Sequence, residues 1–148
     1  MAASMAEPLF FANVVCTLLL AGLIWFVQVV HYPLFGHVGV AESARYAEAH
    51  QRRTTWVVAP LMIGELLTAA ALPFWGPVEL SSAACGMGLL LVVVIWWSTF
   101  RIQVPLHERL LAGYTAAVGE RLVRTNWLRT WAWSLLAAVV TAMAISLV

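Results

Sequence analysis

Four long stretches of the chain consist almost entirely of apolar residues. They cover residues 8–31, 54–76, 80–101 and 126–148. A helix needs about 20 apolar residues, each rising about 1.5 Å, to cross the hydrocarbon core of a bilayer. The pattern therefore predicts four membrane-spanning helices.

The connections between these stretches differ in length and composition. The "GPVE" turn after the second stretch is so short that the second and third spans must form an antiparallel hairpin. Helical composition resumes before the second span, so we expect that helix to begin near Ala41. After the third span, apolar residues at helical spacing predict an amphipathic segment over residues 105–124.

The composition agrees with a membrane protein. Of the 148 residues, 63% are hydrophobic and 10% are charged, against about 45–50% and about 25% in ordinary soluble domains. The net charge is +1 and no soluble basic domain is present, so we expect membrane lipid and no nucleic acid among the partners.

The basic residues are placed asymmetrically. All eight are arginines, and they lie between the first and second spans or between and bordering the third and fourth. The only charged residues in the N-terminal tail and the "GPVE" turn are Glu7 and Glu79. The positive-inside rule therefore places both termini outside. The first stretch has no basic segment before it and is too long for a cleaved signal peptide.

These patterns together predict an all-α integral membrane protein in one domain, residues 1–148. The expected architecture is an antiparallel four-transmembrane-helix bundle with cytoplasmic helical extensions. Cys16 and Cys85 are expected to be free thiols, because spacing alone gives no reason to pair them.

Three histidines fall on the cytoplasmic side of this topology. His31 ends the first span, His50 lies in the helix entering the second, and His107 follows the third. Neutral imidazole is a common transition-metal ligand, and three imidazoles with an open coordination position make a workable catalytic site. We predict a metal site at His31, His50 and His107. The alternative is that each histidine is simply solvated at the bilayer boundary.

Further polar residues accompany these histidines at spacings of three or four, which place side chains on one helix face. Tyr46, Glu108 and Arg129 are the candidates for proton transfer and other catalytic roles. The residues predicted to orient a cofactor or substrate are Gln28, Arg53, Gln103 and Asn126.

Glu65 lies about eleven residues inside the second span, where a carboxylate is costly. It is over 20 Å along the helix from His50, so the two cannot bind one ion. We expect hydrogen-bond partners among Thr68, Thr17 and Thr141. A structural interhelical hydrogen bond and a proton-relay or substrate-contact role both remain open.

Exposed arginines form a basic rim near the cytoplasmic boundary. Attraction to anionic headgroups explains such a rim, and recognition of a carboxylate or phosphate substrate is the functional alternative. The residues are Arg52, Arg53, Arg109, Arg121 and Arg124.

Two segments, "PLHERL" (residues 105–110) and "RTNWLRTWAWS" (residues 124–134), resemble the signature region of small four-span membrane proteins grouped with the fungal anthrone oxygenases. In that family Pro-x-Asn-x-x-Leu follows span three and an Asn-then-Arg element opens span four. Pro105, Leu110, Asn126 and Arg129 match, while His107 replaces the Asn. "VQVVHYPLF" and "YAEAHQRRTTWVVAPLM" resemble segments of bacterial relatives, which implies the bacterial inner membrane.

The resemblance implies a four-helix membrane bundle and oxygenation of an aromatic substrate. Family members are regarded as needing no added cofactor, whereas His107 is a better metal ligand than Asn. The leading hypothesis is an oxygenase-like integral-membrane oxidoreductase that uses Fe, Cu or Zn and acts on a lipophilic small molecule at the cytoplasmic boundary. The alternatives are a haem- or metal-binding protein without enzymatic activity, or an accessory subunit of a larger membrane complex. Homo-oligomers also remain open.

Overall fold

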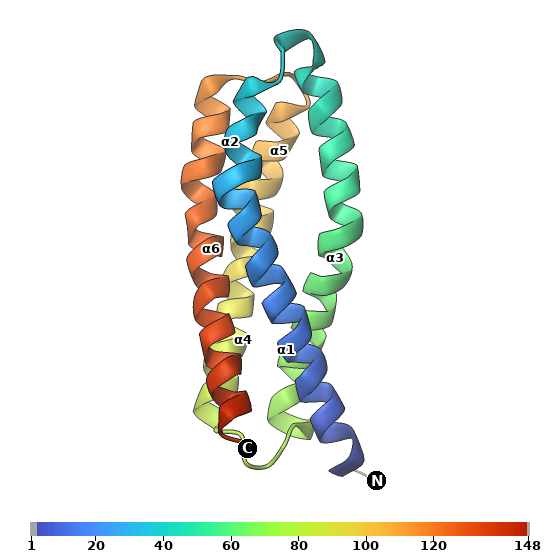
Figure 1. The fold of residues 1–148 in the computed structure, drawn as a ribbon, viewed down its shortest axis with the longest axis vertical. Helices are drawn as coiled ribbons and strands as arrows, with labels where there is room; N and C mark the ends of the chain where they lie inside the picture. The colour runs from blue at the N-terminus through green and yellow to red at the C-terminus, as the bar shows by residue number, and fades with distance from the viewer. Residues whose placement is uncertain (1–2, 148) are drawn as a thin grey trace.

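The computed structural model describes residues 3–147, and almost all of this length is helical. Four long helical segments lie side by side, and both ends of the described chain lie at the same end of the molecule (Figure 1). We call the opposite end the distal end. By length and composition each segment could cross a membrane, over Met5–His37, Val40–Trp75, Ser82–Leu110 and Ala116–Ile145.

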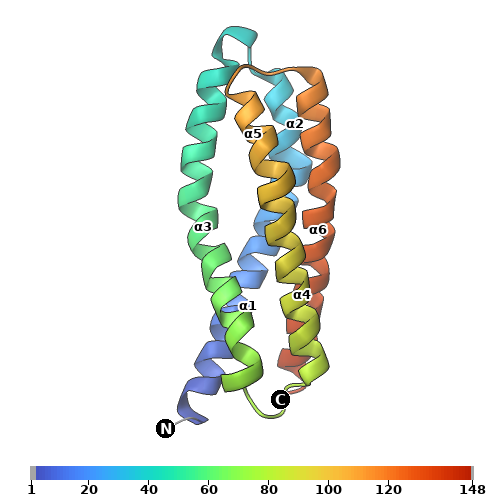
Figure 2. The same cartoon turned by 180° about the vertical axis from the view of Figure 1, so that it is seen from behind.

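The first and third segments are built alike, with a π-helical turn inside each. The first consists of α1 (Ala3–Phe26), the π turn η1 (Val27–His31), α2 (Tyr32–Leu34) and the 3₁₀ turn η2 (Phe35–His37). The third consists of α4 (Ser82–Ser98), the π turn η4 (Thr99–Gln103) and α5 (Val104–Leu110). In Figure 2, which views the molecule from behind, the third segment lies at the front.

Each π turn ends two residues before a proline. In each turn the residue just beyond the turn donates its backbone N–H to the carbonyl five residues earlier, from Tyr32 to Val27 and from Val104 to Thr99. Pro33 and Pro105 then follow at the same offset. A proline has no N–H and its ring clashes with the carbonyl four residues before it, so a wider turn accommodates it.

The second and fourth segments each contain one long α-helix. The second begins with the 3₁₀ turn η3 (Val40–Glu42) and continues as α3 (Ser43–Trp75), which runs through Pro60. The helix expected from about Ala41 therefore forms. The fourth segment is α6 (Ala116–Ile145), which is capped by the Thr115 hydroxyl accepting from the Val118 N–H.

The amphipathic segment expected over residues 105–124 is not one helix. It contributes the end of the third segment and the start of the fourth, because α5 ends at Leu110 and α6 begins at Ala116. Gly113 adopts φ +118° in the connection, a conformation that glycine reaches without a steric penalty. The chain therefore turns back here, and the apolar face is shared between two helices.

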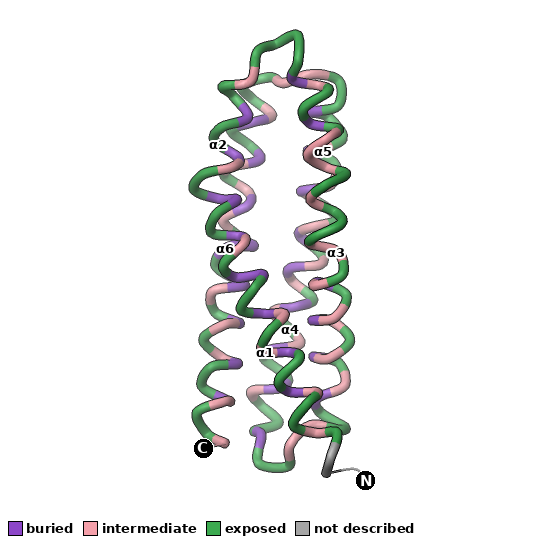
Figure 3. Tube along the Cα trace, turned by 45° about the vertical axis from the view of Figure 1, so that its right-hand side comes forward, coloured by how far each residue is buried: buried purple, intermediate pink, exposed green. Residues whose placement is uncertain are grey.

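The four segments pack around a common core. α1 packs against α3 and α6, and α4 also packs against α3 and α6. Buried residues face the interior along most of the length (Figure 3). The larger cluster includes Leu20, Ile24, Val92, Ile95, Trp133 and Leu136, and a smaller one near the termini includes Phe10, Leu72, Leu80 and Met143.

The outer surface is rich in exposed apolar side chains, including Leu18, Val29, Leu67 and Leu90. Such a surface suits contact with lipid, where the backbone of a helix is satisfied internally. Cys16 and Cys85 are free, as predicted.

Candidate functional site

Three histidines from three different segments meet near the distal end. His31 closes η1, His50 lies in α3 and His107 lies in α5. His31 Nε2 lies 2.7 Å from His50 Nδ1, which is hydrogen-bond distance. The His50 and His107 rings are stacked, with centroids 5.5 Å apart and planes 27° apart. The structure thus brings together the histidines that the topology predicted on one side.

Tyr32 belongs to this group, although no pattern in the sequence selects it. Its hydroxyl lies 2.9 Å from His107 Nε2, so the two groups share a hydrogen bond. Phe35, one helical turn later, packs edge-on against His50 at 5.1 Å between centroids. An aromatic residue at a span end is ordinarily assigned to the membrane interface. The position of Tyr32 therefore does not distinguish a residue of the histidine cluster from an interfacial one.

A cavity of about 420 Å³ lies beside the histidines. All four segments contribute to its wall, and its volume is within the range of about 300–1,000 Å³ typical of small-molecule sites. His50 and His107 line it, whereas His31 lies behind them. Its wall also includes the exposed residues Thr55, Ile63 and Phe100, so the cavity reaches the outer surface between α3 and η4.

The lining of the cavity changes from polar to apolar away from the distal end. Along α3 the lining residues are His50, Gln51, Thr54, Thr55, Val58, Ala59, Met62 and Ile63 in that order. The third segment repeats the trend, from His107 and Gln103 to Trp96. Thirteen residues separate the first and last of the α3 set, which is about 20 Å of helix. The cavity is therefore long and amphipathic.

Arg129 is the charged residue at the polar end of the cavity. It lines the wall and is only 7% exposed. Its NH1 donates to Asn126 Oδ1 at 3.3 Å, and its guanidinium carbon lies 5.0 Å from the Trp133 ring centroid. The Tyr32 hydroxyl also interacts with the guanidinium.

The positive charge of Arg129 has no carboxylate partner. Among residues 3–147 the single ion pair joins Arg45 to Glu42, on the surface. The Nε atom of Arg129 is buried with no hydrogen-bond partner in this part of the chain. A buried cation without a counter-charge is costly, so the site is electrostatically incomplete as it stands.

Gln28 and Asn126 form a closed hydrogen-bond network beside the cavity. Gln28 Oε1 accepts from Asn126 Nδ2 at 2.8 Å and from Thr130 Oγ1 at 3.3 Å. Gln28 Nε2 donates to the Val123 carbonyl at 3.1 Å. Gln28 thus faces α6 while His31 faces α3, because the π turn widens the spacing that would put them on one face. The hydrogen bonds of Gln28 and Asn126 tie the first segment to α6, and neither residue lines the cavity.

Gln103 is the one predicted orienting residue that lines the cavity. Its Nε2 donates to Thr125 Oγ1 at 3.2 Å, and the side chain is 1% exposed. Its Oε1 is buried without a hydrogen-bond partner among the described residues. Gln103 therefore carries a buried, unpaired acceptor atom at the same end as Arg129.

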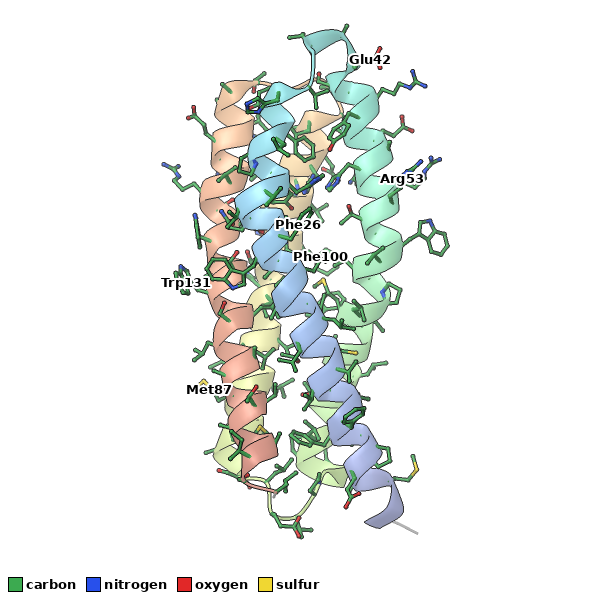
Figure 4. The ribbon with its side chains drawn as sticks, in the orientation of Figure 1. Phe26, Glu42, Arg53, Met87, Phe100 and Trp131 are labelled. Atoms are coloured by element: carbon green, nitrogen blue, oxygen red, sulfur yellow. The ribbon has the colours of Figure 1, made fainter. Side chains whose placement is uncertain are left out.

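Tyr46, Arg53 and Glu108 lie outside the cavity wall, so the cavity does not support the predicted catalytic roles of Tyr46 and Glu108 or the predicted orienting role of Arg53. The Tyr46 ring lies 6.4 Å from the His31 ring and is 37% exposed. Arg53 and Glu108 are exposed, and Arg53 points away from the bundle (Figure 4). Thr54, four residues after His50, contacts its Nδ1 at 3.1 Å instead. The cavity therefore lies on the Thr54 side of α3.

The spacing of the histidine nitrogens matches a hydrogen bond in the present arrangement. Two imidazole nitrogens on one tetrahedral metal, with bonds of about 2.0–2.1 Å, would lie about 3.3 Å apart. His31 Nε2 and His50 Nδ1 are at 2.7 Å, so the rings would part slightly to admit an ion. Within residues 3–147 no group of three or more His, Cys, Asp or Glu side chains is arranged as a metal site. The metal assignment stays a prediction.

Glu65 lies outside the cavity in a separate network. Its side chain is fully buried and accepts from Thr17 Oγ1 at 3.0 Å, and from Trp133 Nε1 at 3.1 and 3.2 Å. Thr17 was among the predicted partners. Thr68 bonds to backbone carbonyls and to Asn13 instead, while Thr141 is exposed. Trp133 was missed, although it follows Arg129 by one helical turn.

Comparisons with known proteins do not identify the site. No protein-family model, curated protein or solved structure matches this chain. The function must be inferred from the side chains that line the cavity.

Proposed function

We propose that the chain inserts into the bacterial inner membrane as an antiparallel four-helix bundle, with the distal end in the cytoplasm and both termini outside. The exposed apolar surface supports insertion. The arginines support the orientation, because those at the start of α3, in α5 and in the first turns of α6 cluster towards the distal end. Figure 4 shows Glu42 and Arg53 at that end and Met87 towards the other.

We propose further that this protein is an oxygenase-like membrane oxidoreductase that acts on a lipophilic molecule. One observation carries the proposal: three imidazoles from three segments converge, and two of them line an amphipathic cavity. The opening between α3 and η4 would admit a substrate sideways from the bilayer. The polar end would then hold the reacting group beside His50 and His107.

The histidines are oriented by neighbouring side chains and would act as bases in their neutral form. His107 is oriented by the Tyr32 hydroxyl, and His50 by His31 and Thr54. Imidazole is the usual general base near neutral pH because its ordinary titration lies there. His50 or His107 could remove a proton from an activated substrate carbon in the cavity.

A metal would add a second function to the same residues. His31, His50 and His107 would hold Fe, Cu or Zn, which would supply Lewis-acid or redox chemistry when bound. Molecular oxygen is the oxidant in the proposed reaction. With anthrone as the probe, the methylene carbon loses two hydrogens and gains one oxygen atom, and the second oxygen atom leaves as water.

The test combines metal content with oxygen uptake. We expect detergent-purified wild-type protein to retain stoichiometric Fe, Cu or Zn after dialysis and to consume oxygen when anthrone is added. The His107→Ala variant is expected to lose most of the bound metal and most of the oxygen uptake. His37→Ala is the matched control, since His37 is exposed and outside the cluster. Elemental analysis, an absorption spectrum and an oxygen electrode give the three readouts.

Two results would overturn the proposal. One is wild-type protein without metal whose oxygen uptake is unchanged in His107→Ala. The other is a Soret band in the spectrum, which would favour the haem-binding alternative.

A further inference from the structure

We infer that the polar end of the cavity is a subsite for an anionic oxygen group, so that the ligand is a lipophilic carboxylate or enolate with its charge against Arg129. The inference names the substrate class of the proposed oxidoreductase and rests on the cavity being its substrate site. It does not depend on a metal or on oxygen chemistry.

The first argument is the incomplete electrostatics of Arg129. The side chain is more than nine-tenths buried and no carboxylate within residues 3–147 pairs with it. Its Nε is buried without a partner, and the residue lines the cavity. A guanidinium presents its donors as a fork that matches a carboxylate. An anionic ligand oxygen against the guanidinium would supply the missing counter-charge.

The second argument is that the polar groups around Arg129 are neutral. The Tyr32 hydroxyl interacts with both His107 and Arg129. His107 and His50 line the same end of the wall. Among the described lining residues, none at this end is Asp or Glu. A cationic group on the ligand, by contrast, would meet Arg129 with no carboxylate to offset the repulsion, whereas a metal ion would be bound directly by the imidazole nitrogens.

The third argument is the polarity of the cavity along its length. The wall runs from Arg129, His107 and Gln103 to Met62 and Ile63 over about 20 Å. A ligand that fills it needs one charged end and an apolar body. Aromatic walls from Trp96, Phe100 and Trp133 would accept a flat ring as well as a chain.

The experiment is photolabelling in phosphatidylcholine nanodiscs with dodecanoic acid that carries a diazirine in its chain. The expected labels fall on α3 between His50 and Ile63 and on residues 96–107. Unlabelled dodecanoic acid should compete, and its methyl ester should compete at least about tenfold less. The same pair made from anthracene-2-carboxylic acid distinguishes a flat ligand from a chain.

The variants isolate the charge. Arg129→Gln should weaken binding of the acid about 10- to 100-fold, the loss expected when charge-assisted hydrogen bonds are removed. Arg45→Gln is the control, because Arg45 is exposed, lies outside the cavity wall and is not part of the predicted basic rim. If Arg129→Gln does not fold, Ala59→Leu serves instead. It narrows the cavity while Arg129 remains, and should also reduce labelling.

Equal competition by acids and esters would overturn the inference, as would unchanged labelling of folded Arg129→Gln or of Ala59→Leu. The outcomes separate it from the proposed function. Metal-free protein that discriminates acid from ester supports the subsite without the oxidoreductase. Metal-loaded protein that consumes oxygen but binds acid and ester alike supports the reverse.

Discussion

Glu65 and Arg129 are two buried charged residues on either side of Trp133, and their surroundings differ. The Glu65 carboxylate accepts hydrogen bonds from two other helices and borders no cavity. The Arg129 guanidinium has an unpartnered buried nitrogen and faces a cavity. One indole touches both, with its N–H on Glu65 and its ring face beside Arg129.

Whether a buried polar group has hydrogen-bond partners distinguishes groups that hold helices together from groups that are suited to bind a ligand. A satisfied buried network adds to the stability and uniqueness of a bundle. A buried group left without a partner carries a desolvation penalty, which a bound molecule can offset. On this criterion Glu65 fits the structural role left open by the sequence, and Arg129 fits a binding role.

The largest expected effect on stability follows removal of Glu65. Glu65→Ala leaves the Trp133 N–H and the Thr17 hydroxyl buried without their acceptor, so the free energy of unfolding should fall by about 1–3 kcal/mol. Unfolding by denaturing detergent measures it. Glu79→Ala, at an exposed position, should change the value by less than about 0.5 kcal/mol. Equal curves for the two variants would show that the Glu65 network contributes little.

A smaller effect is expected from Trp133→Phe, which tests whether the two regions act separately. The substitution removes the N–H donated to Glu65 and keeps an aromatic face for Arg129. The free energy of unfolding should fall by about 1 kcal/mol, the value of one hydrogen bond, while competition by dodecanoic acid stays within about twofold. Trp131→Phe, at an exposed tryptophan of α6, is the control. Labelling that falls as far as in Arg129→Gln would mean that the regions are one site.

The smallest stability effect is expected at Arg129. Arg129→Met removes a buried charge without a carboxylate partner, so the free energy of unfolding should stay within about 1 kcal/mol of wild type. Binding of the acid should be lost in the same protein. If the variant is destabilised as much as Glu65→Ala, Arg129 is a structural residue and the contrast between the two regions fails.

Much of the architecture could be predicted from the hydrophobic pattern. The lengths of the apolar runs identify four helices, and the short "GPVE" connection pairs the second and third. The positions of His31, His50 and His107 relative to these runs suffice to place them at one level. These features depend only on the lengths of the apolar runs and on their order along the chain, and both can be read directly from the sequence.

The neighbours of the histidines could not be predicted in the same way. Counting by three and four paired Gln28 with His31 and His50 with Arg53, whereas Gln28 faces α6 and Thr54 replaces Arg53. Which side of α3 faces the cavity is set by tertiary packing, and packing leaves no local pattern. Tyr32 and Trp133 were hidden because their aromatic side chains also fit an ordinary interfacial role.

The two π turns have an evolutionary consequence. A π turn holds one residue more than the helix around it requires, so it is geometrically equivalent to a single-residue insertion in a regular α-helix. Deleting one residue from Val27–His31 or Thr99–Gln103 would restore regular winding and swing the following segment by about 100°. His31 or His107 would then turn away from His50. Related chains can therefore keep the fold and lose the histidine cluster through one codon.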